Sequence, residues 1–377
     1  GEDNIEYGLE VVGVETDYKT FNALSVVVEQ VENTTEFGGY VDYTMNRGKL
    51  IVQPSLRLQY YSSLSKFRPE PRIGVKYKYN ERLRLKFAAG MYSQNIISAN
   101  SDRDVVNLFY GFLSGPDNLQ DSLTTPSGSR RAVDHPLQTA NHVVAGFEYD
   151  LTEFLNLNVE GYFKHFTQLT NTNRQKLFPD DAAHSDVPEV LRLDYIIESG
   201  FANGVDMVLK YEKRNSYLWL VYGLGNVDRW NGERWYDPVF DRRHNLNLVA
   251  SQDFGANKEW QISARWALGS GLPFTQSQGY YQSPNVNDGI YSDYMTQNAG
   301  QVSIYYADLN EGRLPSYHRL DMSVKRTFED VMGGDLDFTA GVTNVYSREN
   351  VFYINRLTGQ RKNQLPFLPS ISLDWKF

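Results

Sequence analysis

The last eight residues of the chain, Ser370-Ile371-Ser372-Leu373-Asp374-Trp375-Lys376-Phe377, alternate strictly between polar and apolar side chains. Successive side chains of a β-strand point to opposite faces of the sheet, so this pattern predicts a strand with one apolar and one polar face. The same alternation recurs upstream, for example in residues 83–91 and 155–163, where the polar positions are often charged. We count about fourteen such segments of roughly ten residues each.

The length of these segments indicates a membrane-spanning sheet. Ten residues at about 3.3 Å each, tilted by about 45°, rise roughly 23 Å, which is close to the apolar band of an outer-membrane barrel. Strands of soluble proteins are usually about half as long, which disfavours a soluble β-sandwich or propeller. The predicted fold is therefore all-β: a transmembrane antiparallel β-barrel with about fourteen strands in this chain.

The connections between the segments alternate between short and long. Short connections are predicted at residues 45–48, 80–82, 150–153, 212–215, 253–259 and 329–335. Longer ones are predicted at residues 18–35, 61–70, 98–140, 168–196, 228–243, 270–316 and 345–368. A transmembrane barrel has tight turns at its periplasmic rim and long loops outside, and antiparallel strands visit the two rims in turn. The carboxyl terminus is then expected at the periplasmic rim.

The amino-acid composition argues against several classes of protein. The chain has 377 residues, 37 Lys and Arg against 46 Asp and Glu, a net charge of -9, 14% aromatic residues and no cysteine. Its longest apolar runs, such as residues 218–225, are too short for a membrane helix. The absence of cysteine removes disulfides and thiolate zinc sites, and the acidic balance argues against a nucleic-acid partner.

Motifs of catalysis and cofactor binding are also missing from the sequence. The six histidines are far apart, without metal-ligand spacing, and neither a Gly-x-Ser-x-Gly elbow nor a Walker loop occurs. We therefore expect no enzyme activity, no cofactor and no metal. The sequence starts Gly1-Glu2-Asp3-Asn4, without a basic start or an apolar core, so a signal peptide is expected to have been removed or to lie upstream.

An ordered set of motifs resembles the barrel of TonB-dependent outer-membrane receptors. The set comprises Asp241-Arg242-Arg243-His244-Asn245, Gly269-Ser270-Gly271-Leu272-Pro273-Phe274-Thr275, Leu314-Pro315-Ser316-Tyr317-His318-Arg319-Leu320-Asp321, Val342-Thr343-Asn344-Val345-Tyr346-Ser347-Arg348-Glu349-Asn350 and Leu365-Pro366-Phe367-Leu368-Pro369. The resemblance is strongest from residue 241 to the end, and it extends more loosely through residues 102–108 to the start.

The resemblance implies a specific architecture and energy source. In that family a 22-stranded barrel surrounds an amino-terminal plug, and TonB, with ExbB and ExbD, pulls on a short box before the plug to admit a bound ligand. This chain departs from the pattern, because about fourteen strands are present and nothing before Ile5 could be a plug. Residues 1–377 therefore look like the carboxyl-terminal portion of such a barrel, without the plug domain and with the coupling residues absent.

Three groups of residues are predicted to have functional roles. Ile371, Leu373, Trp375 and Phe377 match the family's terminal signal for the outer-membrane assembly machinery. Side chains predicted to face the barrel lumen include Arg57, Lys86, Glu160, Arg265, Arg319 and Asp321. Aromatic loop residues that could stack on a ligand are Trp230, Trp235, Tyr236, Tyr280, Tyr281, Tyr291 and Tyr294. Alternatively, each lumen charge could simply be solvated, and the loop aromatics could pack against one another and against lipopolysaccharide.

Interfacial girdles are expected from aromatic residues near strand ends, as outer-membrane lipids and lipopolysaccharide would require. They are Tyr60, Tyr61, Tyr77, Tyr79, Phe254, Trp260, Phe328 and Phe377.

The function expected first is active uptake of a scarce nutrient, such as a siderophore, an oligosaccharide or a peptide, across the outer membrane of a Gram-negative bacterium. A surface lipoprotein could act as a lid. The first alternative is a self-contained, fourteen-stranded passive channel, in which residues 98–140 could form a constricting loop. The second is an adhesive or structural outer-membrane protein whose loops bind a host or matrix. A plug-coding sequence upstream would favour the receptor, and a signal peptide there would favour the channel.

Overall fold

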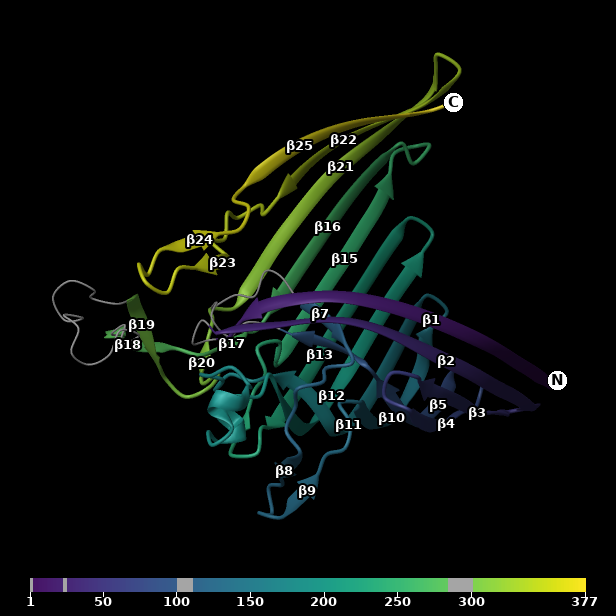
Figure 1. Ribbon diagram of the computed structural model, residues 1–377. Helices are drawn as coiled ribbons and strands as arrows, with labels where there is room; N and C mark the ends of the chain where they lie inside the picture. The colour runs from purple at the N-terminus through teal and green to yellow at the C-terminus, as the bar shows by residue number, and fades with distance from the viewer. Residues whose placement is uncertain (1–2, 23–25, 100–110, 284–300) are drawn as a thin grey trace.

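The computed structural model describes residues 3–22, 26–99, 111–283 and 301–377, and it is built almost entirely of antiparallel strands (Figure 1). One continuous sheet runs in the order β1-β2-β3-β4-β5-β10-β11-β12-β13-β15-β16-β21-β22-β25, with β14 paired to β13. Within the described part of the chain, this path contains fourteen strands joined as antiparallel neighbours, and the predicted all-β barrel class is confirmed. No helix among the described residues has the length and apolar character needed to cross a membrane.

The strands of the main sheet are long, in keeping with a membrane-spanning wall. They are β1 (Asn4–Phe21), β2 (Val27–Arg47), β3 (Leu50–Tyr61), β4 (Lys66–Lys78), β5 (Leu83–Gln94), β10 (Gln138–Thr152), β11 (Leu155–Thr172), β12 (Tyr195–Lys213), β13 (Ser216–Trp230), β15 (His244–Phe254), β16 (Trp260–Gly269), β21 (Tyr317–Val331), β22 (Gly334–Thr343) and β25 (Leu368–Lys376).

Short elements gather in the connections at one end of the sheet. They are β6 (Ile96–Ala99), β7 (Gly111–Ser114), β8 (Ser122–Thr124), β9 (Arg130–Ala132), β14 (Trp235–Tyr236), β17 (Pro273–Phe274), β18 (Ser277–Ser283), β19 (Gln301–Tyr306), β20 (Gly312–Arg313), β23 (Val351–Ile354), β24 (Arg361–Asn363), and the 3-10 turns η1 (Ala182–His184) and η2 (Glu189–Leu191). We call this the loop end of the sheet.

The six predicted tight turns all join strands at the opposite end. Several are shorter than predicted: β2 and β3 are separated only by Gly48 and Lys49, and β21 and β22 only by Met332 and Gly333. Gly48 has a φ of +63° and Gly333 a φ of +82°, backbone conformations that glycine adopts without steric cost. The predicted alternation of short and long connections is thus present in the structure.

Two predicted long connections are wrong. Residues 18–35 were expected as a loop, yet β1 continues to Phe21 and β2 begins at Val27. Their backbones pair as far as Phe21↔Val27, and Lys19 Nζ lies 2.5 Å from Glu29 Oε2 across the ribbon. Strand pairing satisfies the backbone hydrogen-bonding groups in water as well as in lipid. The polar composition of residues 18–35 therefore does not require a loop. Likewise, the connection predicted at residues 61–70 is only residues 62–65.

The two faces of the sheet differ in chemistry. In β3, Leu56 and Leu58 are exposed on one face, whereas Gln59 and Tyr61 are buried on the other. Tyr61 was predicted to join an interfacial girdle, but its hydroxyl lies 3.0 Å from Ser93 Oγ on the inner face. The alternation thus separates an outer apolar surface from an inner polar one, as in a transmembrane barrel.

Aromatic pairs near the tight-turn end have the geometry of an interfacial girdle. The rings of Phe254 and Trp260 are stacked with centroids 6.2 Å apart, and those of Tyr77 and Tyr79 meet edge to face at 6.5 Å. The Arg326 guanidinium lies 4.9 Å from the Trp260 ring centroid, which gives the cation an aromatic partner beside the expected interface.

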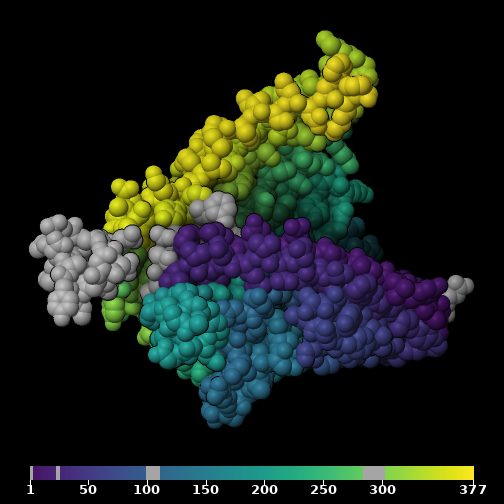
Figure 2. Space-filling view, viewed as in Figure 1, coloured from purple at the N-terminus to yellow at the C-terminus, as the bar shows by residue number. Residues whose placement is uncertain are grey.

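The sheet is open in the structure. β1 pairs with β2 and β25 with β22, and no pairing joins β1 to β25 among the described residues. Figure 2 shows the space between the yellow carboxyl-terminal strands and the purple β1–β2 pair. The fourteen strands therefore form a curved wall with two free edges.

A compact apolar core lies inside this wall, at the loop end. The β6–β7 hairpin packs on the inner face of β1 and β2, and the cluster contains Tyr18, Val28, Ile97, Leu113 and Tyr195, each at most 4% exposed. Tyr195 begins β12, which is seven strands away from β1 in the sheet order. Strands β6 and β7 thus link distant parts of the wall, because residues of both pack with β1, β2 and the start of β12.

Candidate ligand-binding site

A fully buried carboxylate, Glu198 of β12, organises the loop end of the inner wall. Its exposed fraction is 0%. The Tyr236 hydroxyl donates to it with distances of 2.7 Å to Oε1 and 2.8 Å to Oε2, and Asn171 Nδ2 donates to Oε2 at 3.3 Å. A buried carboxylate is stable only when paired and hydrogen-bonded, and these donors meet part of that requirement.

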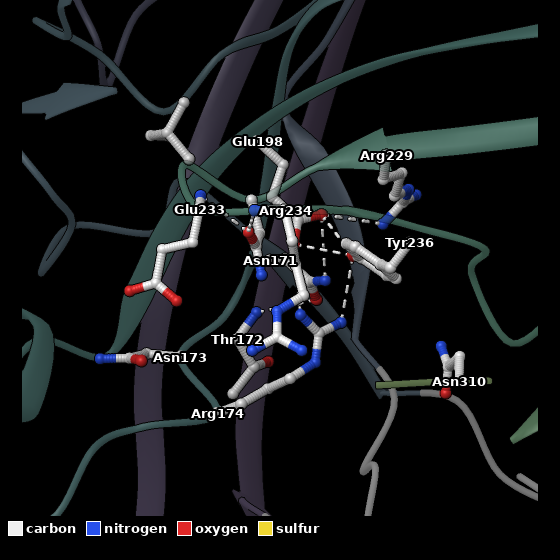
Figure 3. A network of polar contacts seen from close by, with 12 residues as sticks. Asn171, Thr172, Asn173, Arg174, Glu198, Arg229, Glu233, Arg234, Tyr236 and Asn310 are labelled. Atoms are coloured by element: carbon white, nitrogen blue, oxygen red, sulfur yellow. Dashed lines mark hydrogen bonds and ion pairs between the residues drawn. The ribbon is translucent and has the colours of Figure 1, made fainter. Parts of the chain in front are cut away.

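Two arginines complete the pairing of Glu198. Arg174 Nη1 lies 3.2 Å from Oε1 and Arg229 Nη1 lies 3.4 Å from Oε2. Arg174 comes from the connection after β11 and Arg229 from the end of β13, so three neighbouring strands supply the cluster. Figure 3 shows the two guanidinium groups approaching the carboxylate from different sides. One negative charge is thus shared by two positive charges.

Aromatic rings hold both guanidinium groups in place. Arg174 Cζ lies 4.9 Å from the centroid of Tyr236, and Arg229 Cζ lies 5.2 Å from that of Phe240. Tyr236 is itself fixed because β14 pairs with β13, with Tyr236 opposite Arg229. The stacked and hydrogen-bonded arginines therefore have little freedom to lose when a ligand binds.

Burial raises the pKa of Tyr236 to about 12, with the Glu198 carboxylate adding to the rise. Below about pH 10 the phenol is protonated in both the folded and unfolded states, so its contribution to stability is fully present. Above about pH 10 only the unfolded state ionises, and stability falls until the folded pKa is reached.

We therefore expect the free energy of unfolding to fall by about 1.4 kcal/mol per pH unit between about pH 10 and about pH 12 through Tyr236 alone. Denaturant unfolding at several pH values, compared between the natural chain and Tyr236→Phe, isolates this contribution from the other tyrosines. Equal pH slopes in the two proteins would contradict the assignment.

Two cavities flank the Glu198 cluster. The larger has a volume of about 540 Å³ and is lined by residues of four connections between wall strands, including Arg130, Arg174, Asn231, Arg234 and Asp308. The smaller, of about 190 Å³, is lined by Arg174, Arg229, Tyr236 and polar residues of β5, β10 and β11. Arg174 borders both cavities. The loop end thus offers a polar, hydrogen-bonding recess of the size that ligand sites have.

The aromatic residues predicted to bind a ligand are dispersed. Trp230 and Trp235 lie together, with ring centroids 5.5 Å apart, and Trp230 Nε1 donates to the Thr124 carbonyl at 2.6 Å, beside the larger cavity. Tyr236 is only 5% exposed and supports the arginines instead of offering a face to solvent.

The other predicted tyrosines lie elsewhere on the loops. Tyr280 and Tyr281, on β18, are exposed by 51% and 49%, and the Tyr280 hydroxyl donates to the Arg356 carbonyl. Tyr291 and Tyr294 lie outside the described residues, as does the segment 102–108. Their proposed part in ligand binding stays a prediction.

The residues predicted to face the lumen lie on the polar face, mostly in ion pairs. Arg57 pairs with Glu10, and Lys86 pairs with Glu160. Arg319 Nη2 lies 2.8 Å from Asp321 Oδ2, and Asp321 is opposite Arg265 in the sheet register.

The four residues of the predicted assembly signal are exposed on β25 and at the chain end. Exposed fractions are 74% for Ile371, 67% for Leu373, 46% for Trp375 and 97% for Phe377. Such accessibility is what a terminal recognition sequence needs, and its reading by the assembly machinery stays a prediction.

The Glu198 cluster was not predicted from the sequence. Residues 168–196 were predicted as a loop, and Glu198 stands in a run, Tyr195-Ile196-Ile197-Glu198-Ser199, with no regular alternation. Arg174 and Arg229 are distant in sequence from Glu198 and from each other. The available indication was a carboxylate beside a short apolar run, which favours a buried, paired charge. No group of three or more potential metal ligands occurs among the described residues.

Comparisons with known proteins agree with the fold. The family model described as "TonB dependent receptor-like, beta-barrel" matches residues 4–345. No significant match was found among curated proteins.

Solved structures with a similar fold include a siderophore receptor and a ferric enterobactin receptor. Pseudomonas aeruginosa FpvA, bound to pyoverdine and iron, has a TM-score of 0.59 at 12% identity, covering 93% of this chain and 40% of its own. The ferric enterobactin receptor PfeA of Pseudomonas aeruginosa has a TM-score of 0.60 at 12% identity, with 98% and 51% covered. The siderophore receptor PirA of Acinetobacter baumannii has a TM-score of 0.59 at 10% identity, with 99% and 55% covered.

Long antiparallel strands with tight turns at one end and long connections at the other are the features of an outer-membrane barrel. The chain belongs to the TonB-dependent receptor β-barrel family. It spans about half the length of the solved structures that it matches.

Proposed function

We propose that the protein of which this barrel is a part imports a scarce nutrient across the outer membrane, with energy supplied by TonB together with ExbB and ExbD. Family membership over residues 4–345 is the observation that carries the proposal. The nutrient belongs to a class too large for porins, such as a siderophore, an oligosaccharide or a peptide. In this proposal the protein binds and transports the nutrient and does not catalyse a reaction on it.

The larger cavity at the loop end is the proposed capture site. Its volume of about 540 Å³ lies within the range of small-ligand pockets, roughly 300–1,000 Å³. The lining supplies guanidinium groups from Arg130, Arg174 and Arg234 and side-chain amides such as Asn173 and Asn231. These groups suit a hydrophilic ligand with many hydrogen-bonding atoms. The β18–β19 tyrosines extend the aromatic surface around the mouth, where lipopolysaccharide or a surface lipoprotein would also be met.

A whole-cell uptake experiment tests this function. The full polypeptide is expressed in a Gram-negative host lacking its own receptors, and accumulation of labelled ferric citrate, maltotriose and a tripeptide is measured. We expect accumulation of at least one probe against its gradient, and we expect deletion of TonB or collapse of the proton gradient to abolish it. Accumulation that is the same without TonB would contradict the proposal and favour a passive channel.

The passive channel has one observation in its favour. Strands β6 and β7, from the connection between β5 and β10, lie against the inner face of the wall, where Leu113 of β7 packs with Tyr18 and Tyr195. A constricting inner loop is what a channel requires. Against this, the described strands leave both edges of the sheet unpaired, and a barrel can span a bilayer only when it is closed. Loop binding to a host or matrix without uptake, the adhesive alternative, would appear as surface binding of cells with no accumulated probe.

A further inference from the structure

A separate cavity of about 220 Å³ is lined by residues of β2, β3, β4 and β5 and by Asn95, which follows β5. We call it the Asn95 cavity. It is larger than a single water needs and smaller than pockets that hold a whole ligand, so its size suits one chemical group. Gln94 borders both this cavity and the smaller cavity beside the Glu198 cluster, so the two recesses adjoin.

The two arginines that line the Asn95 cavity already have carboxylate partners. Arg57 pairs with Glu10. Arg72 Nη2 donates to Glu70 Oε2 at 2.6 Å, and Arg72 Cζ lies 4.5 Å from the centroid of the Tyr92 ring. Each positive charge of the lining is therefore matched by a negative charge.

Glu36 of β2 also lines the cavity, and it has no ion-pair partner within 4.0 Å among the described residues. Gln59 Nε2 donates to its Oε2 at 3.1 Å, and Arg57 and the Asn95 amide act on its charge from nearby. Arg68 lies opposite Gln59 in the sheet register but does not line the cavity. A half-buried carboxylate without an ion pair is a favourable place for a cation.

Asn95 provides an independent sign of a missing ligand. It is only 2% exposed, and its Oδ1 has no hydrogen-bond partner in the described part of the chain. A buried carbonyl oxygen without a donor costs free energy, so native structures rarely leave one unpaired. Because Asn95 lines the cavity, a group bound there can supply the donor.

The Tyr61 hydroxyl is a further acceptor on the cavity. Ser93 Oγ donates its single proton to Glu70 Oε1 at 2.6 Å. The Tyr61 hydroxyl, 3.0 Å from Ser93 Oγ, must therefore be the donor in that contact. Its own oxygen keeps its lone pairs for another donor, and Tyr61 lines the cavity with Glu36 and Asn95.

We propose that the Asn95 cavity is a subsite for a primary ammonium group of the transported ligand, which donates to Glu36, Asn95 and Tyr61. An ammonium group has three donors and no acceptor, which matches the acceptors that these three side chains present. The inference deepens the proposed function by naming nutrients with an amino group, such as peptides, as the substrate class. It rests on the proposed function for the claim that the ligand is transported.

The test is calorimetric titration of the full, purified polypeptide with 2-aminoethanol, ethylene glycol and glycolate, which are of similar size and are cationic, neutral and anionic. Glu36→Gln removes the charge and keeps an oxygen for Gln59, and Asn95→Ala removes the unpartnered oxygen. The matched control is Glu32→Gln. Glu32 lies earlier on β2 and on the same face, accepts from Gln30 Nε2 at 3.4 Å, and does not line the cavity.

We expect the natural protein to bind 2-aminoethanol more tightly than ethylene glycol or glycolate. Glu36→Gln should weaken the binding of 2-aminoethanol by about tenfold to a hundredfold, and Asn95→Ala should weaken it by about tenfold. Glu32→Gln should bind like the natural protein. The proposal is overturned if either lining variant loses no more affinity than Glu32→Gln, or if ethylene glycol binds as tightly as 2-aminoethanol. Preference for glycolate would also overturn it, because Arg72 Nε, a buried donor without a partner, would then determine the specificity.

The failure of this inference is distinguishable from failure of the proposed function. TonB-dependent accumulation by a protein that does not bind 2-aminoethanol would refute the subsite alone. Binding of 2-aminoethanol that depends on Glu36, in a protein whose accumulation of probes does not need TonB, would refute the energised uptake alone.

Discussion

Replacing Phe87 with arginine is expected to lower the free energy of unfolding by about 2–4 kcal/mol, the cost of a cation on the lipid face near the bilayer midplane. Phe87 lies near the middle of β5 and is 42% exposed on the apolar face, where it pairs with Val75 and Ala145. In a bilayer this exposed surface meets hydrocarbon, which offers a guanidinium group no hydrogen-bond partner. Denaturant unfolding of the full protein in lipid vesicles measures the loss.

Ala88 provides the matched control, because it is the next residue of β5 and points to the other face. Its strand neighbours are Gly74 and Val144, and strand alternation puts it on the same face as Lys86, which pairs with Glu160. The same new side chain, in Ala88→Arg, should therefore reach water and cost less than about 1 kcal/mol. Equal losses for the two variants would remove the assignment of the two faces.

Glu198→Leu is expected to destabilise the loop end by about 2–4 kcal/mol, because it removes the one carboxylate on which two partly buried guanidinium groups, one phenol and one amide converge. The expected loss of about 2–4 kcal/mol is smaller than the largest losses seen for broken buried ion pairs. The reason is that the side chains of Arg174 and Arg229 are each 20% exposed, so water can solvate them in part. Limited proteolysis of the connections around β14, together with denaturant unfolding, measures the effect.

Glu212→Leu is the control for this variant, since it removes a carboxylate from the same strand at the opposite end. Glu212 Oε2 lies 2.7 Å from Lys210 Nζ, and the Glu212 side chain is 65% exposed. An exposed ion pair contributes roughly 0–1 kcal/mol, so little change is expected. A loss for Glu198→Leu as small as that for Glu212→Leu would mean that the cluster does not organise the mouth.

Much of the fold could be predicted because a barrel wall repeats one local rule. Each residue of a spanning strand faces either lipid or lumen, and a one-residue shift would exchange the two faces. The alternation in residues 83–91 therefore reports the environment directly, and β5 was found there. The rule ends at the membrane boundary: beyond it, residues 18–35 continue as a paired ribbon although their composition resembles that of a loop.

The site could be predicted only in part. The motif at residues 241–245 indicated the family, and in the structure Asp241 is 1% exposed and accepts from Arg313 Nη2 at 2.9 Å, so that it fixes two connections to each other. The aromatic content of the loops indicated ligand contact, but Tyr236 packs inside and Trp235 is 42% exposed. Composition alone does not distinguish an aromatic ring that supports a site from one that presents a face.

The sequence by itself determined the strand class, the two faces and the end of the sheet that carries the long connections, because these follow from local periodicity and spacing. The tertiary structure alone decided that Arg174, Glu198 and Arg229 meet, since strand pairing brings together residues up to 55 positions apart (229 − 174 = 55). The buried Glu198 carboxylate meets two guanidinium groups through three-dimensional proximity, which no spacing in the chain encodes.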